Sequence, residues 1–235
     1  MYSFEKIISA LFPKRCAICD EAILPYEMVC PECRIRIRPI SGDTCRKCGK
    51  ALSDKYRLTC YDCSRKIHYF DRGYAIFEYA DVKKSLYRFK YLGRAEYAKC
   101  YAYYANEILG DVIRDLNADA LIPVPIHKKR LTARGYNQAE VLAKEMSPYF
   151  NIPVITDYVI RSKYTVPLKK LDERGRINNL KKAFTIGSNG VKLDTIVIID
   201  DIYTTGSTID AISRLCRESG VRKIVYITVA IGKGL

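Results

Sequence analysis

The feature that most constrains the fold is a run of four branched apolar residues, 196–199, which leads directly into Asp200 and Asp201. A run without polar alternation is typical of a strand that is covered on both faces, as in a parallel α/β sheet. Ligands of such sheets bind beyond the carboxyl ends of the strands. The sequence therefore predicts a parallel α/β domain with a functional loop that begins at the two aspartates.

The loop after the aspartates is rich in small hydroxyl residues and is followed by the helical apolar spacing of Ile209, Ile212 and Leu215. A helix N-terminus that opens with such residues offers hydroxyl and backbone N–H donors to a phosphate group. The residues expected to bind phosphate are Thr204, Thr205, Gly206, Ser207 and Thr208.

The run of residues 196–208 also suits two other interpretations. A nucleoside triphosphatase also carries an apolar strand that ends in aspartate, but the partner motif GxxxxGK[ST] is absent from all 235 residues. Asp200 and Asp201 also suit turn and N-cap positions without any chemistry. The second alternative stays open at this point.

The run IVIIDDIYTTGST, residues 196–208, resembles the phosphoribosyl diphosphate (PRPP) signature of type I phosphoribosyltransferases. Tyr203 departs from it, because a small aliphatic residue is more usual there. The resemblance implies that Asp200 and Asp201 are the catalytic carboxylates, which accept hydrogen bonds from the two ribose hydroxyls. It also implies that residues 204–208 hold the 5-phosphate of PRPP, which binds with Mg²⁺.

Eight of the ten cysteines form four regularly spaced C-x-x-C pairs near the N-terminus: Cys16, Cys19, Cys30, Cys33, Cys45, Cys48, Cys60 and Cys63. Such pairs present two sulfurs to one tetrahedral ion, and eight thiolates are enough for two structural Zn²⁺ sites. A redox role is the weaker interpretation, because redox C-x-x-C motifs occur singly. The spacing favours sequential pairing, as in a double zinc ribbon, but leaves a cross-braced arrangement open.

Length and composition indicate a chain that can fold around a sizeable apolar core. With 235 residues, of which 49% are apolar, there is room for one α/β domain and a small module. No run is long enough to span a membrane, residues 7–12 do not form a secretory signal, and we expect a cytoplasmic protein. The net charge of +14 falls to about +10 when eight thiolates bind two Zn²⁺, and it favours phosphate-rich ligands or nucleic acid.

The predicted boundary lies near Phe70, which gives a double zinc ribbon over residues 1–70 and a phosphoribosyltransferase-like domain over residues 71–235. Strands are expected at residues 74–79 and near residues 120, 154, 196 and 224. Residues 82–109 suggest a long helical stretch that Gly93 divides. Cys100 and Cys216 fall on helical segments and are expected in the core.

A basic segment follows the strand near residue 120. It contains the pattern PVPIH followed by RGYNQ at residues 134–138, which resembles the signature of the ComF-type competence proteins. In that family a zinc module precedes a phosphoribosyltransferase domain, and the resemblance spans residues 16–229. The equivalent loop of phosphoribosyltransferases binds pyrophosphate, and the cations that suit this role are Lys128, Lys129, Arg130 and Arg134. A simply solvated basic loop is the alternative.

Residues 161–184 form a second basic stretch. The resemblance implies a mobile loop that covers the site, with matching positions at Arg174, Arg176 and Asn179. Leu168 stands where a Gln is usual, so one hydrogen bond of the family pattern is missing.

Three functions remain after this reasoning. The resemblance favours a protein of DNA uptake that binds PRPP and single-stranded DNA, together with proteins of the uptake machinery. An active phosphoribosyltransferase on an unknown base or amine acceptor is the alternative, although no residue stands out as a base and His127 suits a structural role equally well. A plain nucleic-acid-binding zinc protein is disfavoured, because DNA phosphates would repel Asp200 and Asp201.

Overall fold

The centre of the molecule is a sheet of four parallel strands. The structure is a computed structural model that describes residues 13–54, 56–162, 183–187 and 190–232. The strands lie in the order β1-β6-β5-β2, and every neighbouring pair is parallel. Their bounds are β1 Arg72–Glu78, β2 Ala120–Pro123, β5 Thr195–Tyr203 and β6 Lys223–Ile231. The predicted parallel α/β fold is confirmed.

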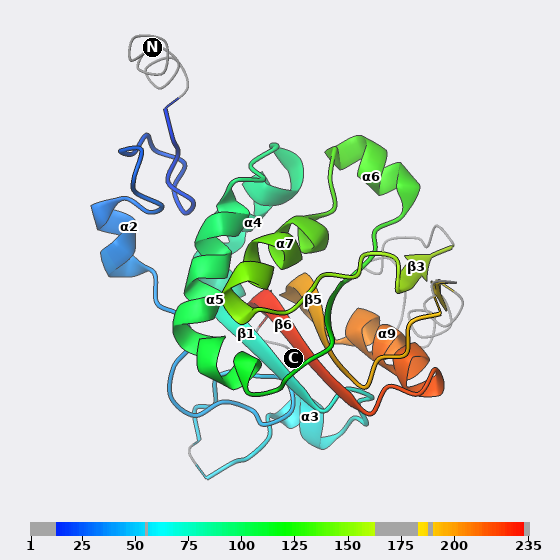
Figure 1. Ribbon diagram of the computed structural model, residues 1–235. Helices are drawn as coiled ribbons and strands as arrows, with labels where there is room; N and C mark the ends of the chain where they lie inside the picture. Colours follow the sequence, from blue (N-terminus) through cyan, green and yellow to red (C-terminus); the bar gives the residue numbers. More distant parts are fainter. Residues whose placement is uncertain (1–12, 55, 163–182, 188–189, 233–235) are drawn as a thin grey trace.

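Helices cover both faces of this sheet (Figure 1). Val197 and Ile199 of β5 pack with three helices on one face, whereas Ile196 and Ile198 pack on the other face, where α9 lies. A strand alternates its side chains between faces, so a continuous apolar run is what double coverage requires. The helices of the first face are α4 Tyr79–Tyr91, α5 Tyr97–Arg114 and α7 Gln138–Phe150, and α9 spans Ser207–Glu218.

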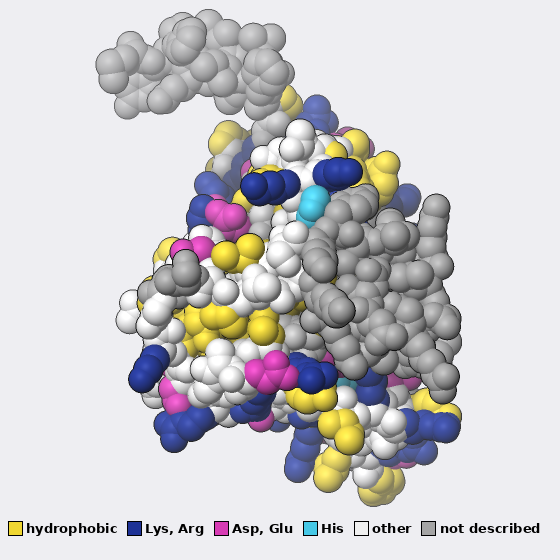
Figure 2. All heavy atoms as spheres, turned by 90° about the vertical axis from the view of Figure 1, so that its right-hand side faces the viewer, with side chains coloured by type: hydrophobic (Ala, Val, Ile, Leu, Met, Phe, Trp, Pro, Cys, Tyr) yellow, Lys and Arg dark blue, Asp and Glu magenta, His cyan; other side chains and the backbone are white. Residues whose placement is uncertain are grey.

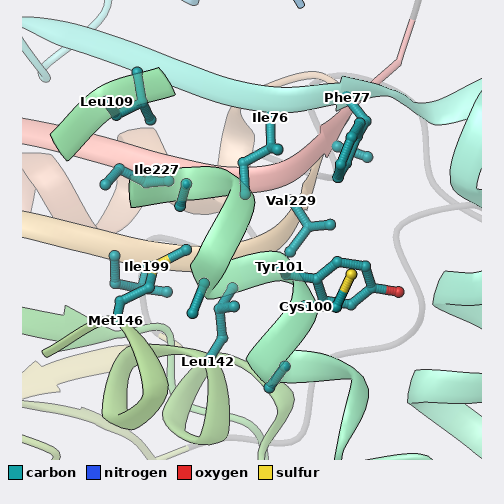
Figure 3. Close-up of a cluster of buried hydrophobic side chains, with 14 of the residues drawn as sticks. Ile76, Phe77, Cys100, Tyr101, Leu109, Leu142, Met146, Ile199, Ile227 and Val229 are labelled. Atoms are coloured by element: carbon teal, nitrogen blue, oxygen red, sulfur yellow. The ribbon is translucent and has the colours of Figure 1, made fainter. Parts of the chain in front are cut away.

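The core of the first face is dense and largely aliphatic (Figure 3). Ile199 and Ile227 of the sheet meet Leu142 and Met146 of α7, and Tyr101 of α5 is fully buried beside them. Cys100 and Cys216 are buried on α5 and α9, as their helical spacing predicted. Both thiols therefore act as core side chains.

The long helical stretch is divided where the sequence predicted. Helix α4 ends at Tyr91 and α5 begins at Tyr97. Gly93 lies between them with φ of +70°, in the left-handed region that favours glycine. The chain can thus turn back and lay α5 along the sheet.

Two expectations differ from the structure. The strand near residue 154 is reduced to a single bridge between Val154 and Leu121, beside Pro153, whose nitrogen has no hydrogen to donate to a ladder. The basic loop contains a short helix, α6 Lys128–Arg134. The remaining strands, β3 Val159–Arg161 and β4 Phe184–Ile186, form a separate antiparallel pair.

The two zinc ribbons lie against opposite faces of the sheet. Cys16 and Cys33 of the first ribbon belong to the core that contains α4 and α5, whereas Cys45, Cys48 and Cys60 belong to the core that contains α9. Their short helices are α2 Pro31–Arg36 and α3 Tyr61–Ser64. The ribbons are thus packed into the α/β cores, and the boundary near residue 70 stays a prediction. Within the described residues, no helix has the length and apolar character to cross a bilayer.

Candidate functional site at the strand ends

The two aspartates lie near the carboxyl end of β5 and face different surroundings. Asp201 is buried, and its Oδ2 lies 2.9 Å from Nζ of Lys90 on α4. Asp200 is half-buried, and its Oδ1 accepts a hydrogen bond of 2.8 Å from the backbone N–H of Asp201. Successive residues of a strand point to opposite faces, which separates the partners of the two carboxylates. Lys90 is a site residue that sequence reasoning did not identify.

The electrostatics of the pair favour a proton on Asp200. Burial and, next in size, the neighbouring carboxylate of Asp201 together raise the pKa of Asp200 to about 7. The backbone N–H of Asp201 and the cations of Lys90 and Arg161 act in the opposite direction. Two adjacent carboxylates with one nearby ammonium group thus leave one of them able to exchange a proton near neutral pH.

Arg161 at the end of β3 acts on Asp200, and a cation of α6 acts on Arg161. Arg161 ends β3, and burial lowers its pKa to about 10, helped by the charge of Arg130 on α6 and opposed by Asp200. His127 precedes α6, and its pKa is lowered by burial and by Arg161, Lys129 and Arg130. The mutual effects place α6, the end of β3 and Asp200 in one electrostatic neighbourhood.

The basic segment is held in place by the RGYNQ motif. Gly135 ends α6 with φ of +82°, and Tyr136 donates a hydrogen bond to the carbonyl of Phe89 on α4. Asn137 caps α7 and donates to the carbonyl of Val124, just beyond β2, at 3.1 Å. These residues fix where α6 leaves and rejoins the sheet.

The cations of the basic segment do not all face the same way. Arg134 donates to Oε1 of Gln138 at 2.9 Å, and its guanidinium lies 4.9 Å from the centre of the Tyr91 ring. Lys128 and Lys129 are exposed, whereas Arg130 is half-buried near Arg161. Figure 2 shows Lys and Arg side chains with one His at the end of the molecule where Figure 1 places α6.

The hydroxyl-rich loop joins β5 to the N-terminus of α9. Gly206 precedes the helix with φ of +74°, and a Cβ there would collide with the ring of Tyr203. Thr204 and Thr205 are exposed, and the Oγ1 of Thr205 lies 2.9 Å from Oγ of Ser207. The free N–H groups and the dipole of a 12-residue helix make this loop suited to an anion.

Tyr203, the unusual residue of the motif, packs against the second ribbon. Its ring stacks on Tyr226 with centroids 5.0 Å apart, and the Tyr226 hydroxyl donates to the carbonyl of Cys48 at 2.9 Å. Nζ of Lys66 lies 3.3 Å from the carbonyl oxygen of Thr205. The second ribbon therefore supports the loop that precedes α9.

The eight cysteines of the C-x-x-C pairs form two compact groups in sequential pairing. Within each group all four sulfurs lie within 4.8 Å of one another, and the Sγ atoms of Cys19 and Cys30, like those of Cys48 and Cys60, are 3.7 Å apart. Tetrahedral zinc with Zn–S bonds of about 2.3 Å places sulfurs about 3.8 Å apart. The arrangement fits two structural zinc sites, and it decides between the two pairings that the spacing left open. The two groups are Cys16, Cys19, Cys30, Cys33 and Cys45, Cys48, Cys60, Cys63.

Backbone N–H groups support the thiolate of Cys16. Burial raises the pKa of Cys16, but hydrogen bonds from the backbone N–H groups of Cys19, Cys30 and Ile18 outweigh it and lower the pKa to about 7. A thiolate is the form that binds Zn²⁺. At Cys16 the knuckle geometry thus favours the thiolate before the metal's own charge is counted.

Part of the sequence-based site lies outside the described residues. Arg174, Arg176 and Asn179 of the second basic stretch belong to that part, as does Leu168. The structure brings Asp200, Asp201, Arg130 and the hydroxyl-rich loop to the same edge of the sheet, because both β2 and β5 end there.

Comparison with known proteins identifies relatives over most of the chain. The profile of the double zinc ribbon domain matches residues 7–64. Competence protein F of Haemophilus influenzae is 31% identical over 206 residues, which cover 83% of this chain and 87% of that protein. Competence protein ComFC of Bacillus subtilis is 29% identical, with coverage of 83% and 80%.

Two further comparisons are more distant. DNA utilization protein YhgH of Escherichia coli K12 is 25% identical over 216 residues, which cover 89% of this chain and 86% of that protein. A purine phosphoribosyltransferase from Pyrococcus horikoshii Ot3 matches 55% of this chain and 72% of its own, with 20% identity and a TM-score of 0.33. That structural likeness is weak, and the fold assignment rests on the strand order and register.

Proposed function

The chain belongs to the ComF family of competence proteins, and from this premise we propose that it binds PRPP at the end of β5 and single-stranded DNA beside it, in a role in DNA uptake. One observation carries the PRPP part: Asp200 and Asp201 lie near the carboxyl end of a buried strand, and the loop after this strand turns through Gly206 into the N-terminus of α9. The competence and DNA utilization proteins among its relatives support the DNA part. The reduced thiols of two zinc sites suit the cytoplasm.

Each part of PRPP has a counterpart in this proposal. Residues 204–208 hold the 5-phosphate with hydroxyl and backbone N–H donors. Asp200 and Asp201 accept hydrogen bonds from the ribose hydroxyls, and the Lys90 ammonium, 2.9 Å from Oδ2 of Asp201, orients that carboxylate. The cations of α6, above all Arg130, attract the diphosphate.

Mg²⁺ is part of the proposal as a companion of the ligand. Carboxylate and phosphate oxygens are the donors that Mg²⁺ prefers, so Asp200 and Asp201 fit such an ion. When bound, it would neutralise diphosphate charge. Ionised Asp200 is needed for this role, and its pKa of about 7 implies that binding of PRPP with Mg²⁺ strengthens as the pH rises through 7.

The alternative is an active phosphoribosyltransferase on an unknown acceptor. The raised pKa of Asp200 favours it, because a carboxylate that exchanges a proton near neutral pH is suited to act as a base, the role that sequence reasoning left without a candidate. Departure of pyrophosphate from C1 would leave an oxocarbenium-like centre, which the two carboxylates would stabilise electrostatically.

Thermal unfolding with and without PRPP and Mg²⁺ tests the assignment. A ligand that binds only the folded chain raises the melting temperature by mass action. We expect a shift for the unaltered chain and a much smaller one for the double variant Asp200→Asn, Asp201→Asn. Asp194→Asn is the matched control, because Asp194 lies at the other end of β5 and pairs with Arg222. No shift at millimolar PRPP would contradict the site, and pyrophosphate release with acceptors present would favour the transferase.

Binding of single-stranded DNA should depend strongly on salt. Each neutralised phosphate of a single strand contributes about −0.7 to the log–log slope, so about five phosphates give a slope near −3.5. Replacing Lys128 and Lys129 by Gln should flatten it, and PRPP should compete for the same cations. Unchanged binding in this variant, together with indifference to PRPP, would place the DNA elsewhere.

A further inference from the structure

A cavity of about 470 Å³ lies between the second zinc ribbon and the loop that precedes α9. Its volume falls within the range of about 300–1,000 Å³ that is usual for small-ligand pockets. Three stretches of chain line it: part of the first knuckle of the ribbon, the segment that follows Cys60, and the end of β5 with Thr204 and Thr205. Asp200, Asp201 and α6 do not line it, so it adjoins the site proposed for PRPP and shares only Thr204 and Thr205 with that site.

One side of this cavity suits an anion. Lys50, Arg65 and Lys66 line it, and the anionic groups beside them are the carboxylate of Asp62 and, on the side of the zinc site, the thiolates of Cys48 and Cys63. Lys50 pairs with Asp62 at 2.6 Å, and Lys66 contacts the carbonyl of Thr205 and lies 3.8 Å from Oδ2 of Asp210. Among the described residues no carboxylate pairs with Arg65, whose side chain is exposed. One positive charge is therefore available to a ligand.

An aromatic ring stands beside that charge. Tyr61 is 54% exposed, and the Arg65 guanidinium lies 5.2 Å from the centre of its ring and hydrogen-bonds its hydroxyl. Stacked aromatic rings and guanidinium groups are the surfaces on which proteins stack unpaired bases. Figure 2 shows hydrophobic and basic side chains interleaved at the end of the molecule where Figure 1 places α3.

We infer that this cavity binds one nucleotide unit of a single strand, with the base stacked against Tyr61 and Arg65 and the phosphate beside Arg65 and Lys66. The inference rests on the single-strand binding in the proposed function and assigns the second ribbon a direct part in it. Because Lys66 also contacts Thr205, the strand would run close to the loop that holds the 5-phosphate of PRPP.

The test is fluorescence anisotropy of a labelled oligodeoxythymidine with the full zinc-loaded chain. Loss of one base stack corresponds to about a 5- to 150-fold weaker dissociation constant, so Tyr61→Ala should weaken binding by that factor and Tyr61→Phe should retain it. Arg65→Gln should weaken binding and reduce the salt slope by about 0.7. Zinc content, measured for each variant, reports whether the ribbon is intact.

Matched controls lie on the first ribbon. Tyr26 is 81% exposed and Arg36 is exposed and paired with Glu32, so Tyr26→Ala and Arg36→Gln should bind like the unaltered chain. Photo-cross-linking of a bromodeoxyuridine strand should label the peptide that contains Tyr61. If Tyr61→Ala and Arg65→Gln bind with unchanged affinity, or if Tyr26→Ala is equally weak, the inference is overturned.

The two proposals fail in different ways. Absence of any oligonucleotide binding by the unaltered chain would remove both this site and the DNA part of the proposed function. Binding that is insensitive to Tyr61 and Arg65 would remove only this site. The PRPP-dependent rise in melting temperature should persist in Tyr61→Ala, which separates the cavity from the PRPP site.

Discussion

His68 and Asp210 are joined by a contact of 2.9 Å between Nδ1 and Oδ2, and the other nitrogen of the His68 ring lies 3.5 Å from Sγ of Cys63. The imidazole is 1% exposed, so no water competes for either contact. One side chain thus links a ligand of the second zinc site to the first turn of α9. Groups that hydrogen-bond to metal ligands orient them and tune the affinity of the site.

His68→Ala should weaken one zinc site and leave the other unchanged. Loss of such an outer contact typically costs about 10- to 100-fold in metal affinity. Competition with a chromogenic chelator should therefore resolve one weakened zinc and one unaltered zinc per chain. His127→Ala is the control, since the other histidine of the chain caps α6 away from the cysteines. Equal weakening of both sites would contradict the link.

Asp200→Asn should stabilise the fold at pH 8. The pKa of Asp200 in the folded chain, about 7, lies above its ordinary value of 3.8, so folding disfavours the ionised form. The stability that the protonated group provides is complete below about pH 4 and is lost as the pH rises toward and through 7. Asparagine removes this loss, with a gain of roughly 1–4 kcal/mol above pH 7 that disappears near pH 4. Urea unfolding at several pH values measures it.

Asp194→Asn should change the free energy of unfolding at pH 8 in the opposite direction to Asp200→Asn. Its hydrogen bond with Arg222 holds the pKa of Asp194 below its ordinary value, so this carboxylate contributes stability that is present at neutral pH and lost as the pH falls through the folded pKa. The substitution should lower stability at pH 8. If both variants shift in the same direction, the raised pKa of Asp200 is not the cause.

Gly206→Ala should destabilise the loop more than Gly93→Ala destabilises the turn between α4 and α5. Both glycines have positive φ, but a Cβ at Gly206 meets the Tyr203 ring, whereas a Cβ at Gly93 meets nothing within 4 Å. Left-handed strain alone costs about 1–2 kcal/mol, and the collision with Tyr203 adds to it. Melting temperatures of the two variants compare these costs. Equal shifts would show that the Tyr203 ring yields without penalty.

Loss of either zinc should loosen one face of the sheet. Cys33 packs in the core of α4 and α5, and Cys60 packs in the core of α9. Cys33→Ser should therefore speed amide hydrogen exchange in α5, whereas Cys60→Ser should speed it in α9. Peptides of the opposite face serve as the internal control. Exchange that rises only within residues 13–64 would mean that the ribbons unfold on their own.

Local patterns predicted the parts of the fold that depend on neighbouring residues. Three features could be predicted because a few neighbouring residues determine their geometry. They are the four C-x-x-C pairs, the doubly buried strand and the glycine before α9. The helix α6 was not predicted, because its helical geometry depends on the caps at His127 and Gly135 and on anchoring by Tyr136. The strand expected near Val154 is only a single bridge. Apolar composition predicts an extended, buried segment, but it does not predict which neighbouring strand the segment pairs with or over what length.

The long-range contacts of the site could not be read from the sequence. Nothing in the sequence around Lys90 predicts its ion pair with Asp201. Likewise, nothing in the segment after the last cysteine of the ribbons predicts its contact with α9. The departure at Tyr203 was visible, but its reason, a stack on Tyr226 beneath the second ribbon, required the structure. The assignments of Thr204 to Thr208 and of α6 to PRPP stay predictions.

The placement of the ribbons on opposite faces of the sheet also governs the order in which the chain can assemble during synthesis. Cys48 meets Tyr226, 178 residues later, and at about 5–20 residues per second the ribosome needs roughly 9–36 s to supply that partner. Throughout this interval the second ribbon still lacks its partners in β6, and its zinc ion is the main group that organises it. The supply of zinc to the nascent chain therefore determines whether folded ribbons are present to pack on both faces of the β-sheet when its last strand is made.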